Sequence, residues 1–499
     1  MMSNKLAAHK LGFRDYFALS MVGMLPYAYI VSVAAGYVTY AGYGALFVGF
    51  LAFALVLVMS LPIIEYTRLA NFTGGYYGLA ERGFGKIVGK YTALLNYGYY
   101  TFFSVGNALE VPMIGIATIY LVLGVLPPYW AYVALSVTTV VILYIGSFRK
   151  VSTLPKIGFW SVITQMVVLG AVAAFIIIHT PYNSLKFLNP VLSTNGFRGI
   201  ALAAAAFGFL NFTGYGNPLF YSEEGKESKR DAWRAIIVAL IIYTIVGQFA
   251  VYAEIVSVHS ISTIAGSPLP LISAALPYLG TIPVLILGIM GLPWFYTCII
   301  STGGSQARLL YSMSRDDFIR SSKLKKLDKN QAPRNAATAN FIIVLLVSLA
   351  ITFIEYAVYG WNETSLFYMA FTPWTTAVLL WYGHHFIPDI ALYTFYKKNK
   401  IKVSLIRKVL LGIAAPATGV GLFIFAFYYG IIGNLVEPYL AFVILGLLLY
   451  IGFFAYVIVK RKSLGEDVIK YMDTEIGISN VSGVAPSRSG GPAHEETPP

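Results

Sequence analysis

The basic residues of this chain are sorted along its length: long apolar stretches separate the loops, and Lys and Arg collect in every second loop. About a dozen such stretches, each roughly 20 residues long, run between residues 16 and 459, and this length spans the hydrocarbon core of a bilayer as a helix. Of the 35 Lys and Arg residues, only Lys186 and Arg198 fall in loops of the other set. Because short basic loops stay in the cytoplasm, the sequence predicts a multi-pass protein of the cell (plasma) membrane with both termini in the cytoplasm.

The composition agrees with a membrane protein. Hydrophobic residues make up 58% of the chain and charged residues 11%, whereas soluble domains carry about 25% charged residues. The net charge of +13 lies beside apolar spans, so we expect anionic lipids at the cytoplasmic face as partners, and no nucleic acid. The single cysteine, Cys298, excludes an intrachain disulfide and a metal site built from several cysteines. We expect no cofactor and no metal. No segment resembles a nucleotide-binding loop or a soluble catalytic domain, so we expect neither an ATP-driven pump nor an enzyme.

The apolar stretches predict an all-α polytopic membrane protein of about 12 transmembrane helices. The expected spans are 16–38, 44–66, 91–125, 129–147, 157–179, 200–221, 235–257, 283–311, 336–357, 366–390, 409–430 and 438–459. The segment 463–499 is polar and has too few apolar residues to pack, so we predict a disordered cytoplasmic tail without a role in transport.

Two of these spans contain helix-breaking residues. The first carries Gly23 and Pro26, and the sixth carries the run NFTGYGNP at 211–218. Proline lacks an N–H and clashes with the preceding turn, and interrupted helices in transporters bind polar ligands with the backbone groups that the break frees. One Gly or Pro in a membrane helix more often serves packing or a kink. The two breaks fall in spans one and six, which an inverted repeat of five plus five helices makes equivalent. This placement favours a role in ligand binding over packing.

Four groups of residues, in this order and spacing, resemble the amino acid–polyamine–organocation superfamily of secondary transporters. They are GYVTYAGYG at 36–44; EYTR at 65–68 with TGGYY at 73–77 and FG at 84–85; FTGY at 212–215 with EEGK at 223–226 and RA at 234–235; and RLLYSMSRD at 308–316 with APR at 332–334. The resemblance covers about residues 14–408, and the last two helices match only in number.

The resemblance implies a leucine-transporter-type fold with discontinuous helices 1 and 6. It divides the chain into a cytoplasmic N-terminus (1–15), a first five-helix repeat (16–180), a second, inverted repeat (200–396), two peripheral helices (409–459) and the tail (463–499). It also implies alternating access, with substrate bound at the bilayer midplane between helices 1, 3, 6, 8 and 10. Members carry amino acids, polyamines or related organic cations, driven by protons, sodium or exchange.

The first helix departs from the family pattern. Relatives unwind there at a Gly-Ser-Gly-Ile element whose backbone N–H groups hold the substrate carboxylate, and the matching residues here are YAYI at 27–30. Tyrosine exposes backbone groups less freely than glycine. The helix can still break at Pro26, and tyrosine hydroxyls can replace the backbone donors, so the question whether this element binds a carboxylate stays open.

The resemblance assigns a substrate site to residues of five helices. They are Gly23, Pro26, Tyr27, Ala28 and Tyr29 on the first; Tyr100 and Ser104 on the third; Phe212, Thr213, Gly214 and Tyr215 on the sixth; Thr302 on the eighth; and Trp374 on the tenth. Plain packing is the alternative role for the tyrosines. An aromatic gate before the sixth-helix break would fall at Leu210, beside Phe209.

Ion or proton coupling has four candidates, Glu110, Ser301, Ser305 and Gln165. Burial disfavours a charged carboxylate, so Glu110 could carry a proton or attract a cationic substrate; the alternative is a neutral Glu hydrogen-bonded to Asn107 or a tyrosine. Ser301 and Ser305 match the region of coupling-ion ligands on the eighth helix. Gln165 lies where some relatives have a lysine, so the sequence does not support a fixed-lysine mechanism, and coupling to proton or sodium stays open.

The tenth span also carries ionisable side chains. His384, His385 and Asp389 lie toward its inner end, where we expect a solvated or interfacial role.

These features predict a secondary active transporter, a permease for amino acids or related amines. The alternatives are an organic-cation or polyamine carrier, another metabolite carrier or an exchanger of the same fold, and, more remotely, a non-transporting membrane sensor.

Overall fold

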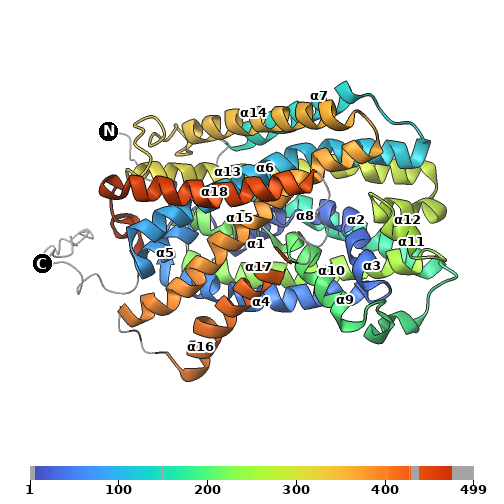
Figure 1. The fold of residues 1–499 in the computed structure, drawn as a ribbon, viewed down its shortest axis with the longest axis horizontal. Helices are drawn as coiled ribbons and strands as arrows, with labels where there is room; N and C mark the ends of the chain where they lie inside the picture. The colour runs from blue at the N-terminus through green and yellow to red at the C-terminus, as the bar shows by residue number, and fades with distance from the viewer. Residues whose placement is uncertain are drawn as a thin grey trace, which may run out of the picture.

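The structure is a computed structural model that describes residues 6–147, 151, 153–398, 401, 403–425, 427–428 and 438–474. Within these ranges, 9 helices are long and apolar enough to cross a membrane, or up to 10 if a bent pair counts as one span. Most helices run along the long axis of the molecule (Figure 1). The chain is therefore an all-α polytopic membrane protein, while the count of twelve spans and the inverted repeat stay predictions.

The first five predicted spans coincide with helices of the N-terminal half. In chain order these are α1 (Phe13–Gly23), α2 (Pro26–Ser32), α3 (Ala34–Ala41), α4 (Ala45–Leu69), the short strand β1 (Ala70–Asn71), α5 (Tyr76–Phe84), α6 (Lys86–Leu123), α7 (Tyr129–Ser147) and α8 (Thr153–His179). Helix α5 lies between the second and third predicted spans, in a segment for which the sequence analysis predicts no helix.

The remaining spans also coincide with helices. They are α9 (Gly196–Ala203) with the short turns η3 (Ala204–Gly208), η4 (Leu210–Phe212) and η5 (Asn217–Glu224); α10 (Ser228–Val256); α11 (Ser262–Ala265); α12 (Pro270–Leu279); α13 (Thr281–Arg315); α14 (Arg334–Tyr359); α15 (Glu363–Lys398); α16 (Leu405–Val409), η6 (Leu410–Ala414) and α17 (Ala415–Phe425); and α18 (Tyr439–Val459). Part of the predicted eleventh span, 429–430, lies outside the described residues.

Helix α6 forms the centre of the bundle and α18 its periphery. In the apolar part of α6, 78% of the residues are buried, against 17% in α18. Helices α7 and α14 lie together along one edge in Figure 1, and α16 lies at the opposite edge. We call the end where α1 and α6 begin and α13 and α15 end the basic end of the bundle, because the predicted inner loops lie there.

The first span is broken between Gly23 and Pro26, the two helix-breaking residues of the sequence, and so before the YAYI element that the resemblance aligned with the break in relatives. Helix α1 ends at Gly23, Leu25 has left-handed backbone angles (φ 53, ψ 59), and Pro26 is the first residue of α2. Proline suits the first position of a helix, because the N–H that it lacks would have no partner there. The YAYI element is therefore helical, and the break lies at Met24 and Leu25, whose N–H groups donate to the carbonyl oxygens of Met21 and Val22.

The sixth span is broken where the sequence predicts. Regular helix ends at Ala203, irregular turns follow, and Gly214 takes a φ of +90 before η5 begins at Asn217, with Pro218 as its second residue. Only glycine adopts such a φ without strain. The discontinuous first and sixth helices are thus present in the structure.

The chain after α18 folds back onto the basic end. Residues 464–474, which we call the C-terminal strap, contain the turn η10 (Val468–Tyr471) and the strand β2 (Asp473–Thr474), which pairs antiparallel with β1. Val468 and Met472 are buried. The predicted tail is therefore packed in its first part, and 475–499 lie outside the described residues.

Candidate functional site

The breaks in the first and sixth spans touch each other. A Cβ added to Gly23 would collide with the carbonyl oxygen of Gly214, and one added to Gly214 would collide with the carbonyl oxygen of Gly23. The Ser20 hydroxyl donates to the Tyr215 carbonyl oxygen at 2.8 Å, and the Tyr243 hydroxyl donates to the Met24 carbonyl oxygen at 2.8 Å. The carbonyl groups of Met24 and Tyr215, at the two breaks, thus accept hydrogen bonds from side chains. The absence of side chains at Gly23 and Gly214 allows the two backbones to cross.

Asn217 connects this crossing to the helices around it. Its Oδ1 accepts from the Tyr100 hydroxyl at 2.8 Å, and its Nδ2 lies 3.5 Å from Ser301 Oγ. The same Nδ2 would lie 2.6 Å from a Cβ on Gly23. The sequence analysis did not select Asn217 as a site residue, although its position in the run 211–218 was the available signal.

Two polar side chains beside the crossing have no protein partner. Helices α6 and α13 run antiparallel, and Ser104 Oγ donates to Gln306 Oε1 at 3.1 Å. One turn farther along each helix, Asn107 and Thr302 lie at matching levels. Both are completely buried, and neither the amide of Asn107 nor the hydroxyl of Thr302 has a hydrogen-bond partner. An unpaired buried polar group costs about 1–3 kcal/mol, so this position favours a polar ligand.

Glu110 lies one turn of α6 beyond Asn107 and is 4% exposed. It forms no ion pair with any described residue. The Trp374 indole faces the carboxyl group, and it also packs against Gly106 and lies with its ring centroid 4.8 Å from that of Phe103. A hydrogen bond from Asn107 to Glu110 is absent, because both amide atoms of Asn107 are unpaired. Glu110 therefore lies next to Asn107 along α6, and Trp374 packs against the same helix at Phe103 and Gly106.

The residues predicted on the first helix are bonded within the protein. Tyr27 N–H donates to Gln165 Oε1 at 3.2 Å, and its hydroxyl donates to the carbonyl oxygens of Leu287 and Gly288 at 3.3 and 3.2 Å. The Tyr29 hydroxyl lies 3.2 Å from that of Tyr37 and accepts from Gln248 Nε2 at 2.9 Å. Ala28 is buried and its carbonyl oxygen accepts from Ser32. In this conformation, both tyrosine hydroxyls hold α2 in place.

The predicted coupling residues occupy separate places. Gln165 bonds the Tyr27 N–H and donates from Nε2 to Ser161 Oγ at 2.9 Å. Ser301 contacts Asn217, whereas the Ser305 hydroxyl donates to the Ser301 carbonyl oxygen at 3.2 Å. Of these three, Ser301 alone lies next to the crossing of the breaks.

The predicted sixth-helix residues surround the break. Thr213 Oγ1 donates to the Leu210 carbonyl oxygen at 2.7 Å, and the Phe212 ring lies 5.6 Å from that of Tyr243. Tyr215 is buried with its ring 5.6 Å from His385. At the predicted gate, Leu210 is partly exposed, while Phe209 is 1% exposed and packs against Trp381.

The structure buries the ionisable residues of the tenth span. His384, His385 and Asp389 are 1%, 0% and 0% exposed, so the expected solvated role is wrong. The reason is helix α5, whose Tyr76 ring lies 4.9 Å from His384 and 4.7 Å from His385 and covers this face of α15. Among the described residues, no group of three or more His, Cys, Asp or Glu side chains could hold a metal ion.

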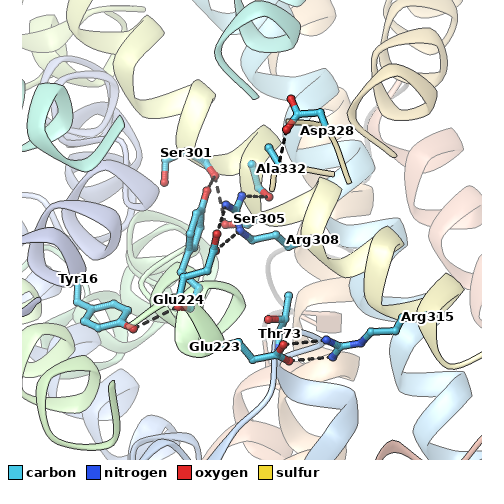
Figure 2. A network of polar contacts seen from close by, with 12 residues as sticks. Tyr16, Thr73, Glu223, Glu224, Ser301, Ser305, Arg308, Arg315, Asp328 and Ala332 are labelled. Carbon is cyan, nitrogen blue, oxygen red and sulfur yellow. Dashed lines mark hydrogen bonds and ion pairs between the residues drawn. The ribbon is translucent and has the colours of Figure 1, made fainter. Parts of the chain in front are cut away.

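Two ion pairs join the end of the sixth span to α13 at the basic end, and Figure 2 shows both. Neighbouring carboxylates at the end of the sixth span each bind an arginine of α13 through two hydrogen bonds. Arg308 bonds Glu224 at 2.6 and 3.0 Å, and Arg315 bonds Glu223 at 2.7 and 2.8 Å. Such bidentate pairs fix geometry as well as charge. The two pairs hold η5 against the long helix α13.

A second charged cluster lies at the same end. Lys90 is completely buried, with Nζ 2.9 Å from Glu81 Oε2 and 2.5 Å from Asp316 Oδ2. Burial raises the pKa of both carboxyl groups, although Lys90 lowers it. The C-terminal strap completes the cluster, because Val468 N–H donates to Glu81 Oε1 and Glu466 N–H donates to the Asp316 carbonyl oxygen.

Comparison with known proteins agrees with this architecture. A family model described as amino acid permease matches residues 11–457, which include both helix breaks and both arginine–glutamate pairs. None of the curated proteins matches the chain. The chain is a multi-pass membrane protein of the transporter type, and it belongs to the amino acid permease family.

Proposed function

We propose that this protein is a secondary active transporter that moves amino acids or related amines across the cell membrane by alternating access. The substrate binds beside the crossing of the two helix breaks, between α6, α13 and α15. The basic end faces the cytoplasm, because short basic loops are retained on that side.

The observation that supports this site best is the pair of unpartnered side chains, Asn107 and Thr302. Their amide and hydroxyl groups are buried at one level of the antiparallel helices α6 and α13. A polar or charged group of a small substrate would satisfy them. Tyr27 and Tyr29 are bonded elsewhere, so the substrate does not depend on their hydroxyls in this conformation.

Alternating access requires that the basic end open and close. Its present closure rests on Arg308 with Glu224 and Arg315 with Glu223, which join the sixth span to α13. A movement of the sixth span away from α13 would break both pairs together, and the substrate site lies directly above them along α13. These two pairs support the proposal of a carrier that is closed at its basic end.

A cationic substrate is the second candidate, and Glu110 favours it. This buried carboxyl group lies one turn from Asn107 without a cationic partner among the described residues. A primary or secondary amine would supply that partner, so polyamines or amines without a carboxylate would bind through Glu110.

Thermal stabilisation tests the proposal, because a ligand that binds the native state raises its melting temperature. The purified protein would be heated with each standard amino acid, with putrescine and with spermidine, with and without sodium. We expect stabilisation by at least one amino acid, followed by its uptake into proteoliposomes. Stabilisation by the amines alone, lost in Glu110→Gln, would assign the protein as a cation carrier.

Matched variants locate the site. Asn107→Ala and Thr302→Val should each weaken ligand binding about tenfold, which corresponds to one lost hydrogen bond to a buried polar group. Asn96→Ala is the control, because Asn96 is also a buried, unpaired asparagine of α6 but lies 11 residues nearer the basic end. Equal loss in all three variants would contradict the proposed site.

A further inference from the structure

His385 and Asp389 form a buried pair of ionisable side chains whose polar atoms are all unpaired. They lie four residues apart on α15, and therefore on one face of the helix. Both are 0% exposed, and both ring nitrogens of His385 and both carboxyl oxygens of Asp389 lack a hydrogen-bond partner. Neither side chain takes part in the substrate site or in the ion pairs of the basic end.

Aromatic side chains from two other elements lie against His385. Tyr76 of α5 and Tyr215 of the sixth-span break have ring centroids 4.7 and 5.6 Å from that of His385. Tyr99 of α6 lies 4.9 Å from His384. The Tyr76 hydroxyl also lies against Gly216, so the pair is connected through one side chain to the broken sixth span.

Among the described residues, no charged group on the surrounding elements forms an ion pair with Asp389, and this includes Arg82 of α5, whose Nε has no hydrogen-bond partner. On α5 and α6, Glu81 pairs with Lys90. On α4, Glu65 pairs with Arg68 and Arg407. On α14, Glu355 accepts a hydrogen bond from Thr372 at 2.6 Å, and on α18, the Tyr450 hydroxyl donates to the Leu379 carbonyl oxygen at 2.6 Å. His384 Nδ1 lies 3.2 Å from the Leu380 carbonyl oxygen. Among the described residues, no cation therefore compensates a negative charge on Asp389.

We propose that Asp389 and His385 form an exchangeable proton site, and that the proton bound there is the coupling ion of this permease. A carboxylate beside a neutral imidazole carries one negative charge. One proton taken from solvent, held either as the carboxylic acid or as the imidazolium, makes the pair neutral overall. Burial favours this neutral form, because an uncompensated buried charge is costly.

The position of the pair explains how the proton acts on transport. With the proton bound, the pair is compatible with the closed packing of α5 and the sixth-span break against α15. When the proton leaves, the charge on Asp389 favours hydration, and water reaches the pair only if these elements separate. A proton therefore biases the equilibrium between closed and open conformations, as any ligand with different affinities for two states does.

This inference rests on the proposed transport function, so the test has one readout that does not require transport. Infrared difference spectra of the full chain in lipid, recorded across a pH titration, detect the carbonyl stretch of protonated carboxylic acids. We expect a titrating band that disappears in Asp389→Asn and persists in Glu254→Gln. Glu254 is the matched control, since it is a completely buried carboxyl of α10 with both oxygens unpaired.

The second readout is transport in proteoliposomes, with a radiolabelled mixture of the standard L-amino acids as the probe. An inward proton gradient should drive accumulation in the wild type. Asp389→Asn and His385→Gln should lower that accumulation about tenfold or more while exchange of internal for external amino acids continues. Asp389→Glu retains a carboxyl group, so it should retain both the titrating band and the dependence of accumulation on the proton gradient. This variant tests the inference even if Asp389→Asn fails to fold.

The outcomes separate the two proposals. If no amino acid moves in the wild type, the transport assignment fails for this substrate class, and the infrared band still decides the proton site. An unchanged band in Asp389→Asn, accumulation that follows a sodium gradient alone, or loss of the proton response in Glu254→Gln in place of Asp389→Asn would each overturn the inference.

Discussion

Gly23 and Gly214 face each other where the first and sixth spans are broken, and each blocks a Cβ on the other. A side-chain carbon at either position would meet the carbonyl oxygen of the opposite glycine. Gly214 also has a φ of +90, so it is constrained twice. The crossing of the two spans therefore depends on two residues without side chains that are almost 200 positions apart in the sequence.

Gly214→Ala should lower the free energy of unfolding by about 2–4 kcal/mol and abolish transport, because it adds both backbone strain and a collision. Thermal melting in detergent and uptake in proteoliposomes measure the two effects. Gly170→Ala is the control: Gly170 lies within α8, a Cβ there meets nothing within 4 Å, and alanine in a helix gains up to about 1 kcal/mol over glycine. Wild-type uptake by Gly214→Ala would show that the crossing is not required.

Arg308 and Glu224 make a second prediction possible. Both are buried, at 3% and 0% exposure, so Arg308→Met leaves an uncompensated carboxylate and should cost about 3–5 kcal/mol. The double variant Arg308→Met with Glu224→Gln should recover most of that loss, because it removes the isolated charge. Arg230→Ala removes a side chain that is 54% exposed in its pairs with Glu227 and Asp231, and it should lower the melting temperature far less than Arg308→Met does. Additive losses in the double variant would exclude a direct coupling of the two side chains.

Removal of the C-terminal strap provides the third prediction. Truncation after Ser463 deletes three buried side chains, Leu464, Val468 and Met472, each worth about 1.5–3 kcal/mol when fully buried. It also breaks the hydrogen bond between Lys86 Nζ and the Gly465 carbonyl oxygen at 2.9 Å. We expect a lower melting temperature for this truncation and an unchanged one for truncation after Thr474. Equal melting of the two truncated chains would mean that the strap does not stabilise the basic end.

The sequence predicts the positions of the helices well, because hydropathy alone determines where a chain can cross a membrane. It also predicts the sixth-span break, since the run 211–218 combines glycine, proline and asparagine. The residue before Pro26 is disfavoured in a right-handed helix, but no local signal places Leu25 in the left-handed conformation. Leu25 lies two residues after Gly23, whose contact with Gly214 only the tertiary structure provides.

Long-range contacts also explain what the sequence analysis placed incorrectly. His385 and Asp389 are buried because Tyr76, more than 300 positions earlier, covers them. Spacing along one helix shows which side chains share a face, and the partner of that face cannot be read from the helix itself.

The cluster of Lys90, Glu81 and Asp316 should make stability depend on pH. Burial raises the pKa of both carboxyl groups in the folded protein, so the folded state binds more protons than the unfolded state just above their ordinary pKa values. Stability should therefore fall as the pH rises through the window between the ordinary and the raised pKa, and level off above it.

Glu81→Gln leaves Lys90 with one carboxylate and keeps an acceptor for the Val468 N–H, so its melting temperature should fall less steeply over this window. Melting curves from about pH 4 to about pH 8 measure the slope, with Glu227→Gln, an exposed carboxylate that pairs with Arg230, as the control. A wild-type profile without this decline, or a Glu81→Gln profile as steep as the wild type, would show that the raised pKa of these carboxyl groups does not set the pH dependence of stability.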